Sequence, residues 1–280
     1  MVRSTPAVLS LVALLLAASA SAAAPEEIPF RLIDGFIAVE GRIEQSPSVL
    51  TFLLDSGASE SVLHSGTAQR LGVATGPAQS VRAVASEAVA HRLKGVRASS
   101  GTLDLGPVSL AADLAAADRL CSCPVDGLVG APFFRDRVVQ LDFVSRRIRV
   151  LETAPSFGDS PLRLPLKLQN GIVCAAVGVN GSKPRWARLD TGCNEPLHWV
   201  VPRVRGNREI PSGSIGFVSQ PEDLALVSVS LGSRTIYHTE VVLHGRELFP
   251  GESGLLGTGL LSRFRRVTVD WPRRALYLEE

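Results

Sequence analysis

The stretch Leu53-Leu54-Asp55-Ser56-Gly57 returns in the second half of the chain as Arg188-Leu189-Asp190-Thr191-Gly192. In each copy an Asp ends an apolar stretch, and a hydroxyl residue and a Gly follow it. One such motif carries little information, because Asp and Gly are common in turns. Two copies predict a duplicated fold in which each half supplies one carboxylate.

The similarity between the halves extends beyond this motif. In chain order, the matched pairs are residues 28–37 with 164–173, Leu103–Gly106 with Val229–Gly232, Gly127–Gly130 with Gly254–Gly257, and Leu141–Phe143 with Val269–Trp271. These ordered matches indicate one ancestral lobe that was doubled and fused, with a shorter middle in the second copy. A chance alignment of Ala, Val, Leu and Gly is the less favoured explanation.

The composition is that of a globular protein with ample material for a core. The chain has 280 residues, of which 45% are hydrophobic and 20% are charged. The formal net charge is only +2. We therefore expect no strong electrostatic attraction to nucleic acid.

The first residues have the pattern of a signal peptide. Arg3 is followed by an apolar stretch from Val8 to Ala17, which is too short to span a bilayer, and then by small residues. We interpret residues 1–23 as a signal peptide and expect an exported, soluble chain, periplasmic or secreted, with no membrane contact after its removal. A retained anchor is the alternative.

Four cysteines remain in the mature chain: Cys121, Cys123, Cys174 and Cys193. In an exported protein an even number permits two disulfides, and three pairings stay open. A bridge between Cys121 and Cys123 is expected to be awkward at this close spacing. Zinc binding is the rival interpretation, but the Cys-x-Cys pair lacks a second pair and the five histidines are scattered. We predict no metal and no cofactor.

Most of the chain consists of short segments rich in Val, Leu and Ile that end at Gly, Pro or Asn, which predicts an all-β protein. A short helix is expected over Ser65–Leu71 and a turn near Pro132–Arg137. Alignment of the halves makes Ala111–Leu120 a strand. The proline-containing segment 153–163 is interpreted as a linker between an N-terminal lobe, 24–152, and a C-terminal lobe, 164–280.

Two Asp-Ser/Thr-Gly loops that face each other have a specific chemical use. Gly57 and Gly192 allow the backbone to approach closely, and Ser56 and Thr191 can donate to the opposite lobe. Two carboxyl groups at short range cannot both ionise, so Asp55 and Asp190 would share one proton. The ionised group can then activate water while the protonated group polarises a carbonyl. Gly130 and Gly257 can pack directly behind these loops.

With these residues the chain resembles the aspartic proteases, both pepsin-like and retropepsin-like. Phe52–Ser59 resembles the first active-site loop of that family, and Asp126–Gly130 resembles its hydrophobic-hydrophobic-Gly element. Gly254–Phe264, continuing to Asp270, resembles the closing element of bacterial retropepsin-like domains.

The resemblance implies two pseudo-twofold-related β-barrel-like lobes with a central cleft. It also implies catalysis by Asp55 and Asp190, with support from Ser56, Gly57, Thr191 and Gly192. A peptide or protein substrate would lie extended in the cleft. Retropepsins assemble from two chains, whereas this chain carries both lobes, so a monomer is expected.

Several features depart from the family pattern. The expected flap, Val81–Leu93 with its tip near Ser86-Glu87, has no Tyr, and its second-lobe equivalent near Ser219–Glu222 is shorter. Cys193 and Asn194 follow the second motif, where small or hydroxyl residues are usual. Ala58 has no side-chain donor for Asp55, which predicts a less acidic dyad and a mildly acidic pH optimum.

An exported aspartic endopeptidase is therefore the favoured function. The alternative is a pseudo-protease that binds peptides with little or no turnover. A serine or metal hydrolase is disfavoured because the chain has no G-x-S-x-G or H-E-x-x-H motif.

Overall fold

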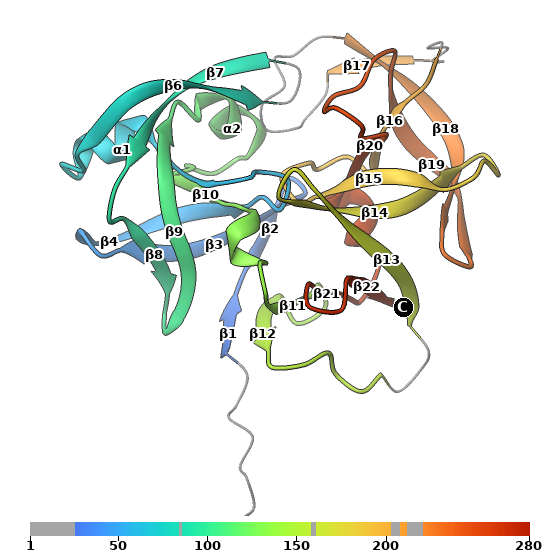
Figure 1. Ribbon diagram of the computed structural model, residues 1–280, viewed down its shortest axis with the longest axis horizontal. Coiled ribbons are helices and arrows are strands. Elements are labelled where there is room, and N and C mark those ends of the chain that lie inside the picture. Colours follow the sequence, from blue (N-terminus) through green and yellow to red (C-terminus); the bar gives the residue numbers. More distant parts are fainter. Residues whose placement is uncertain (1–25, 84–85, 158–160, 203–207, 212–220) are drawn as a thin grey trace, which may run out of the picture.

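The computed structural model describes residues 26–83, 86–157, 161–202, 208–211 and 221–280. The predicted signal peptide, 1–23, lies outside these ranges. The regular secondary structure of the described chain is almost entirely β-strand, and the strands form two lobes (Figure 1). The prediction of an all-β protein is confirmed.

The N-terminal lobe contains a closed barrel of six strands. In order around the barrel, with the first also pairing the last, the strands are β3 (Phe36–Ile43), β4 (Ser46–Leu54), β10 (Gly127–Val129), β5 (Ser61–His64), β9 (Leu103–Ala112) and β8 (Arg97–Ser100). The β4–β10 and β5–β9 pairs are parallel, and the other pairs are antiparallel.

The C-terminal lobe repeats this barrel with the same strand order. Its strands are β14 (Ile172–Val179), β15 (Arg185–Asp190), β20 (Gly254–Gly257), β16 (Leu197–Val200), β19 (Arg234–His244) and β18 (Pro221–Leu231), and β18 closes the ring by pairing with β14. The parallel pairs again fall at equivalent places, β15–β20 and β16–β19. The two-barrel architecture predicted from the sequence is confirmed.

A sheet that both lobes share lies beneath the barrels (Figure 1). Its strands, in spatial order, are β1 (Glu26–Pro29), β12 (Arg147–Leu151), β11 (Val138–Asp142), β21 (Arg266–Asp270), β22 (Ala275–Glu279) and β13 (Leu162–Gln169). The two lobes meet at the antiparallel β11–β21 pair. β13 begins at Leu162, inside the segment 153–163 that the sequence predicts as a linker.

The remaining elements are short. They are β2 (Arg31–Ile33), α1 (Ser65–Arg70), β6 (Thr75–Ala83), β7 (Ser86–Leu93), α2 (Ala115–Leu120), η1 (Ala131–Phe133), β17 (Arg208–Pro211) and α3 (Thr258–Leu261). α1 confirms the helix predicted at Ser65–Leu71. β6 and β7 form the hairpin at the predicted flap position, on the upper side of the first lobe in Figure 1.

The predicted flap tip, Ser86-Glu87, lies within β7. Ser86 pairs with Ala83 and Glu87 pairs with Arg82, while residues 84–85 lie outside the described ranges. The predicted second-lobe equivalent, Ser219–Glu222, lies partly outside the described residues and partly in the first two residues of β18.

The strand predicted over Ala111–Leu120 is wrong. β9 ends at Ala112, and residues 115–120 form α2. The error came from the alignment of Gly106 with Gly232. Gly101 and Gly232 are the glycines with positive φ, 56° and 58°, in the turns that join β8 to β9 and β18 to β19. Gly232 therefore corresponds to Gly101.

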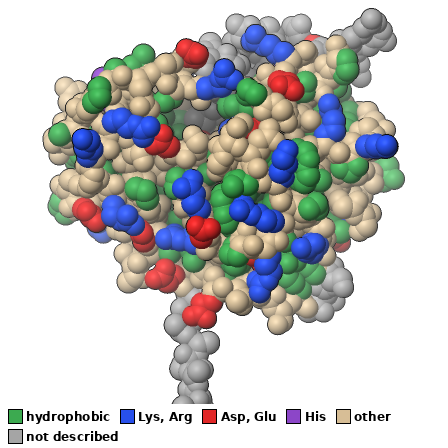
Figure 2. Space-filling view, viewed as in Figure 1, with side chains coloured by type: hydrophobic (Ala, Val, Ile, Leu, Met, Phe, Trp, Pro, Cys, Tyr) green, Lys and Arg blue, Asp and Glu red, His purple; other side chains and the backbone are tan. Residues whose placement is uncertain are grey.

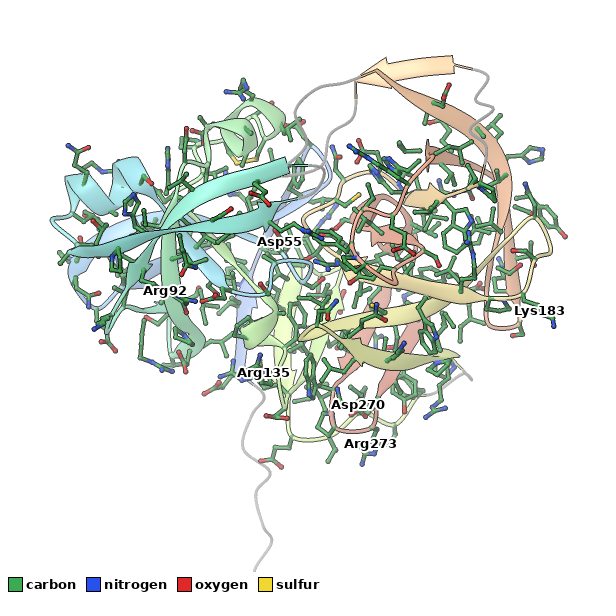
Figure 3. The ribbon with its side chains drawn as sticks, turned by 45° about the horizontal axis from the view of Figure 1, so that its top comes forward. Asp55, Arg92, Arg135, Lys183, Asp270 and Arg273 are labelled. Atoms are coloured by element: carbon green, nitrogen blue, oxygen red, sulfur yellow. A yellow bond between two sulfur atoms is a disulfide. The ribbon has the colours of Figure 1, made fainter. Side chains whose placement is uncertain are left out.

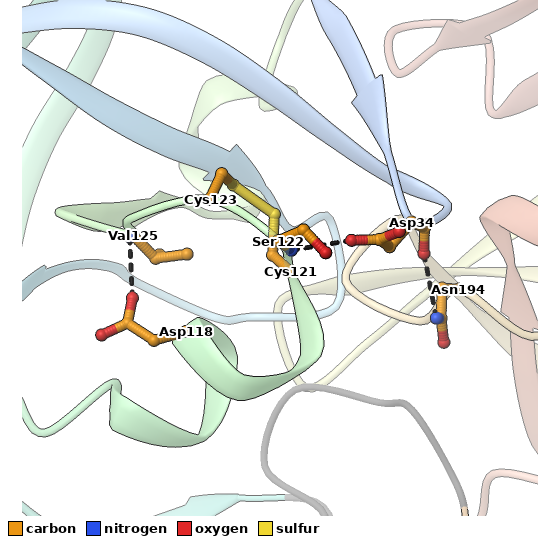
Figure 4. The surroundings of a disulfide bond; sticks show 7 residues. All are labelled: Asp34, Asp118, Cys121, Ser122, Cys123, Val125 and Asn194. Atoms are coloured by element: carbon orange, nitrogen blue, oxygen red, sulfur yellow. Dashed lines mark hydrogen bonds between the residues drawn. A yellow bond between two sulfur atoms is a disulfide. The ribbon is translucent and has the colours of Figure 1, made fainter.

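A disulfide joins Cys121 to Cys123 just after α2 (Figure 4). The Cα atoms are 5.2 Å apart, within the usual range for a disulfide, so the expectation that this close spacing disfavours a bridge is wrong. Cys174 and Cys193 are buried free thiols. The chain thus has one disulfide among its described residues rather than the two that the count permits.

The core and the surface match the composition. One apolar cluster continues from the N-terminal barrel through the shared sheet into the C-terminal barrel.

On the face shown in Figure 2, Lys and Arg side chains are spread among acidic and hydrophobic ones and do not gather in a single patch. No helix in the described ranges is long and apolar enough to cross a membrane.

Candidate active site

Asp55 and Asp190 lie at equivalent ends of two barrel strands. Asp55 directly follows β4, and Asp190 is the last residue of β15. Both side chains are buried, with exposed fractions of 7% and 4% for the two residues. Figure 3 shows Asp55 where the two lobes meet, while Lys183 and Arg273 lie at the periphery. The two motifs thus converge at the interface between the lobes.

The hydroxyl groups of the motifs connect the two loops by reciprocal hydrogen bonds. Ser56 Oγ donates to the carbonyl of Leu189 at 2.7 Å, and Thr191 Oγ1 donates to the carbonyl of Leu54 at 2.7 Å. Each hydroxyl oxygen also accepts a bond from the other loop. Ser56 N donates to Thr191 Oγ1 at 2.9 Å, and Thr191 N donates to Ser56 Oγ at 3.1 Å. These four buried bonds fix each carboxylate loop relative to the other.

The glycine of each loop lies against the carboxyl group of the other loop. A Cβ atom on Gly57 would lie 2.5 Å from Asp190 Cγ, and one on Gly192 would lie 2.5 Å from Asp55 Cγ. No larger residue fits at either position without movement of the loops. This close approach brings the two carboxyl groups into a direct hydrogen bond.

The two carboxyl groups differ in their surroundings. Asp55 Oδ1 accepts bonds from the backbone N–H groups of Gly57 and Ala58, both at 3.0 Å, whereas Asp190 Oδ1 accepts one, from Gly192 at 3.0 Å. Burial raises the pKa of Asp55, and these N–H donors oppose the rise. Burial and then the charge of Asp55 raise the pKa of Asp190 to about 8. The additional N–H donor favours the charged form of Asp55, so we assign the negative charge of the pair to Asp55 and the shared proton to Asp190.

Glycines behind the loops allow close strand packing, as expected. β10 runs parallel to β4 and is followed directly by Gly130, and β20 runs parallel to β15 and ends at Gly257. A Cβ on Gly130 would lie 2.8 Å from the carbonyl oxygen of Ala58, and one on Gly257 would lie 2.8 Å from that of Cys193. Side chains here would push the carboxylate loops out of place.

Asn194, one of the departures from the family pattern, links the lobes. Its Nδ2 donates to the carbonyl of Asp34 at 3.0 Å, and the Asp34 carboxylate accepts from Ser122 N, between the disulfide cysteines, at 2.7 Å (Figure 4). The second loop is thus connected to the disulfide segment of the first lobe. Its motif keeps the same Gly192-to-Asp190 bond that the first loop has between Gly57 and Asp55.

A buried ion pair beside the dyad was not anticipated from the sequence. Arg188 Nε and Nη2 donate to the two carboxylate oxygens of Glu252 at 2.7 and 2.8 Å, and Arg188 Nη1 donates across the lobe interface to the carbonyl of Gly57 at 2.7 Å. The guanidinium also stacks on the Phe249 ring, 3.4 Å from its centroid. Its positive charge lowers the pKa of both dyad carboxyls.

One sequence signal could have revealed this ion pair. Arg188 stands two residues before its Asp, where the first copy has the apolar Leu53. A charge at a strand position that must be buried requires a buried partner. Glu252 lies 64 positions after Arg188, so only the tertiary structure identifies it as the partner.

The dyad opens into a cleft of about 700 Å³ between the lobes. The cleft walls include Val81 and Ala88 of the flap hairpin on one side and Ile172 and Phe249 on the other. Most of the residues that line the cleft are apolar, and the buried acidic residues among them are Asp55 and Asp190. Such a cleft can hold an extended chain over the dyad while limiting access of bulk water.

Comparison with known families gives a match to the aspartyl protease family over residues 39–133. The match includes Asp55 and the strands of the first barrel around it. It supports an aspartic protease of the retropepsin-like kind. A comparison with curated proteins finds no match.

The glycine contacts predict that Gly57→Ala and Gly192→Ala each force the carboxylate loops apart. We expect each to destabilise the fold by about 1–3 kcal/mol and to lower any hydrolytic activity by about 10²-fold. Thermal unfolding and rate measurements test this. Gly66→Ala is the matched control, because the nearest atom to its Cβ would be at 3.7 Å. If both variants unfolded at the wild-type temperature and kept the wild-type rate, the close packing of each glycine on the opposite carboxyl group would be contradicted.

The buried ion pair predicts a large cost when one partner is removed. Arg188→Ala leaves the Glu252 carboxylate, 1% exposed, without its partner, and should lower the free energy of unfolding by about 3–5 kcal/mol. The double change Arg188→Leu with Glu252→Leu should cost less, since no charge stays buried. Arg234→Ala, which breaks the exposed pair with Glu280, is the control at about 0–1 kcal/mol. The free energy of unfolding is measured by urea denaturation. If Arg188→Ala lowers it by no more than Arg234→Ala does, Arg188 and Glu252 do not form the buried ion pair described here.

Proposed function

We propose that this protein is an aspartic endopeptidase in which Asp55 and Asp190 activate water for peptide hydrolysis. The observation that carries the proposal is the buried, hydrogen-bonded pair of carboxyl groups at the floor of an interlobe cleft. The family match over residues 39–133 supports the protease class.

The difference in proton affinity assigns a role to each carboxyl group. Ionised Asp55 takes a proton from a water molecule placed between the two groups, and the water oxygen bonds to the carbonyl carbon of the substrate. Protonated Asp190 gives its proton to the carbonyl oxygen, which yields a neutral tetrahedral diol. Asp55 then passes its proton to the leaving nitrogen, and Asp190 recovers a proton from the diol as the C–N bond breaks. Both carboxyl groups return to their starting states.

The surroundings support this division of roles. Asp55 has two backbone donors that stabilise its charge, and the nearby Arg188 guanidinium stabilises the single negative charge of the pair. The four cross-loop bonds hold the groups in place before substrate binds, so little reorganisation is needed during the reaction. An extended peptide or protein segment would lie under the β6–β7 hairpin.

On this proposal the active site is complete within one chain, because each lobe provides one carboxylate. A monomer is then sufficient for activity. We also propose that residues 1–23 direct export, so that the mature enzyme works in the periplasm or outside the cell.

Removing either carboxyl group tests the proposal. We expect Asp55→Asn and Asp190→Asn each to lower cleavage of a mixed peptide library by about 10²–10⁴-fold, because each loses one proton-transfer partner. Asp136→Asn, at an exposed turn with positive φ that Asn tolerates, is the matched control. Binding of peptides by the unmodified protein without cleavage at any pH would favour the pseudo-protease alternative. Cleavage that survives in both Asn variants would exclude the dyad mechanism.

The pKa shifts predict the pH dependence of cleavage. Activity requires ionised Asp55 and protonated Asp190, so it should rise as Asp55 ionises and fall as pH increases through the pKa of Asp190, about 8. A pH–rate profile with an alkaline limb in this region and an optimum in the mildly acidic to neutral range is the expected result. A profile that peaks below about pH 3 would contradict it.

A further inference from the structure

A second cluster of reactive side chains lies directly after the Asp190 loop. The Sγ atom of Cys193, a carboxylate oxygen of Glu195 and a ring nitrogen of His198 all lie within 4.8 Å of one another. Cys193 and His198 are fully buried, and Glu195 is half-buried with 14% of its side chain exposed. The proposed hydrolysis uses none of these groups.

The spacing of these atoms fits a tetrahedral zinc site. Zinc bonds of about 2.3 Å to sulfur and about 2.0–2.1 Å to nitrogen and oxygen give tetrahedral edges of about 3.5 Å for S–O and about 3.3 Å for N–O. Cys193 Sγ is 3.5 Å from Glu195 Oε2, and His198 Nε2 is 3.3 Å from the same oxygen. Both edges that meet at Glu195 Oε2 therefore have the length that a tetrahedral zinc site requires, and the third pair, Cys193 Sγ and the His198 nitrogen, lies within 4.8 Å.

His244 orients the histidine of the cluster. β16 and β19 are paired in parallel, and their His198 and His244 rings stack with centroids 5.1 Å apart and an interplanar angle of 13°. His198 Nδ1 lies 2.8 Å from His244 Nε2. With the proton on Nδ1 of His198, this contact is a hydrogen bond, and the Nε2 lone pair points at Glu195. A metal-ligating histidine commonly donates its second nitrogen to such an outer partner.

In this tautomer the Nε2 lone pair and the carboxylate oxygen, 3.3 Å apart, can both bind one cation. In the other tautomer Nε2–H donates to Glu195, so zinc binding selects the first. The same ion would also engage the Cys193 sulfur, which is 3.5 Å from the same carboxylate oxygen and gives up its proton on binding.

We propose that Cys193, Glu195 and His198 form a zinc site, with His244 as the positioning partner of His198. The mixed sulfur, nitrogen and oxygen donors favour zinc over magnesium or calcium. Three protein ligands leave a fourth position for water. The three ligands lie within six residues as Cys-x-Glu-x-x-His, a spacing that differs from zinc motifs built on cysteine pairs.

The position of the site connects it with the second carboxylate loop. Cys193 is three residues after Asp190, and its carbonyl accepts from Thr258 N at 2.8 Å. Its neighbour Gly192 packs on the Asp55 carboxyl group. Bound zinc would thus restrain the loop that carries Asp190, and we expect the full chain to unfold at a higher temperature with zinc than with a chelator.

Cobalt(II) and zinc titrations of the chelator-treated mature protein test the proposal. We expect one equivalent of cobalt to give the intense visible absorption of a tetrahedral site and a thiolate-to-cobalt charge-transfer band, and zinc to displace it. Cys193→Ser should lose the charge-transfer band. Cys174→Ser is the matched control, because Cys174 is the other buried free thiol and lies outside the cluster.

Two further variants keep the test decisive if Cys193→Ser does not fold, as judged by circular dichroism. Glu195→Gln changes a half-buried side chain and should weaken zinc binding, and His244→Phe should weaken it by about 10–100-fold through loss of the positioning bond. No uptake of zinc or cobalt by the folded wild-type protein would overturn the proposal. So would uptake that is equal in the wild type, Glu195→Gln and His244→Phe. Since metal binding is measured directly, this result is independent of whether the protein cleaves peptides.

Discussion

The reciprocal hydrogen bonds between Ser56 and Thr191 are the interaction on which the rest of the site depends. Each hydroxyl donates to the backbone of the opposite lobe and accepts a backbone N–H from it. These bonds are buried, so breaking one would leave polar groups without partners and cost more than the bond itself contributes. They hold Gly57 and Gly192 against the facing carboxyl groups, and this contact makes the two acids share a proton.

The two lobes have similar folds but give their catalytic carboxyl groups different surroundings. The barrels have the same strand order, but the residue two positions before the Asp is Leu53 in one lobe and Arg188 in the other. Arg188 places a buried positive charge beside the dyad in the C-terminal lobe. Its guanidinium also donates across the lobe interface to the carbonyl of Gly57. Asp55 also has one more backbone donor than Asp190. A nearly symmetric frame therefore holds a chemically asymmetric pair.

The sequence predicted the features that depend on local pattern and missed those that depend on packing. Alternating polarity and the two Asp-Ser/Thr-Gly motifs were sufficient for the all-β fold and the two lobes. The match of Gly106 with Gly232 was out of register because several short apolar segments fit one another equally well, and it turned α2 into a strand. Glu252 and His244 could not be assigned as partners of Arg188 and His198, because loops and strand pairing bring them together from more than 40 positions away in sequence.

The central claim is that Asp55 and Asp190 act together on one reacting centre. A crystal structure of the protein with a peptide whose scissile amide is replaced by a tetrahedral secondary alcohol tests it most directly. The account predicts that the peptide lies extended in the cleft beneath β6 and β7, with its hydroxyl group hydrogen-bonded to both carboxyl groups. A peptide bound with this hydroxyl away from the dyad, or in contact with only one of the two carboxyl groups, would contradict the account.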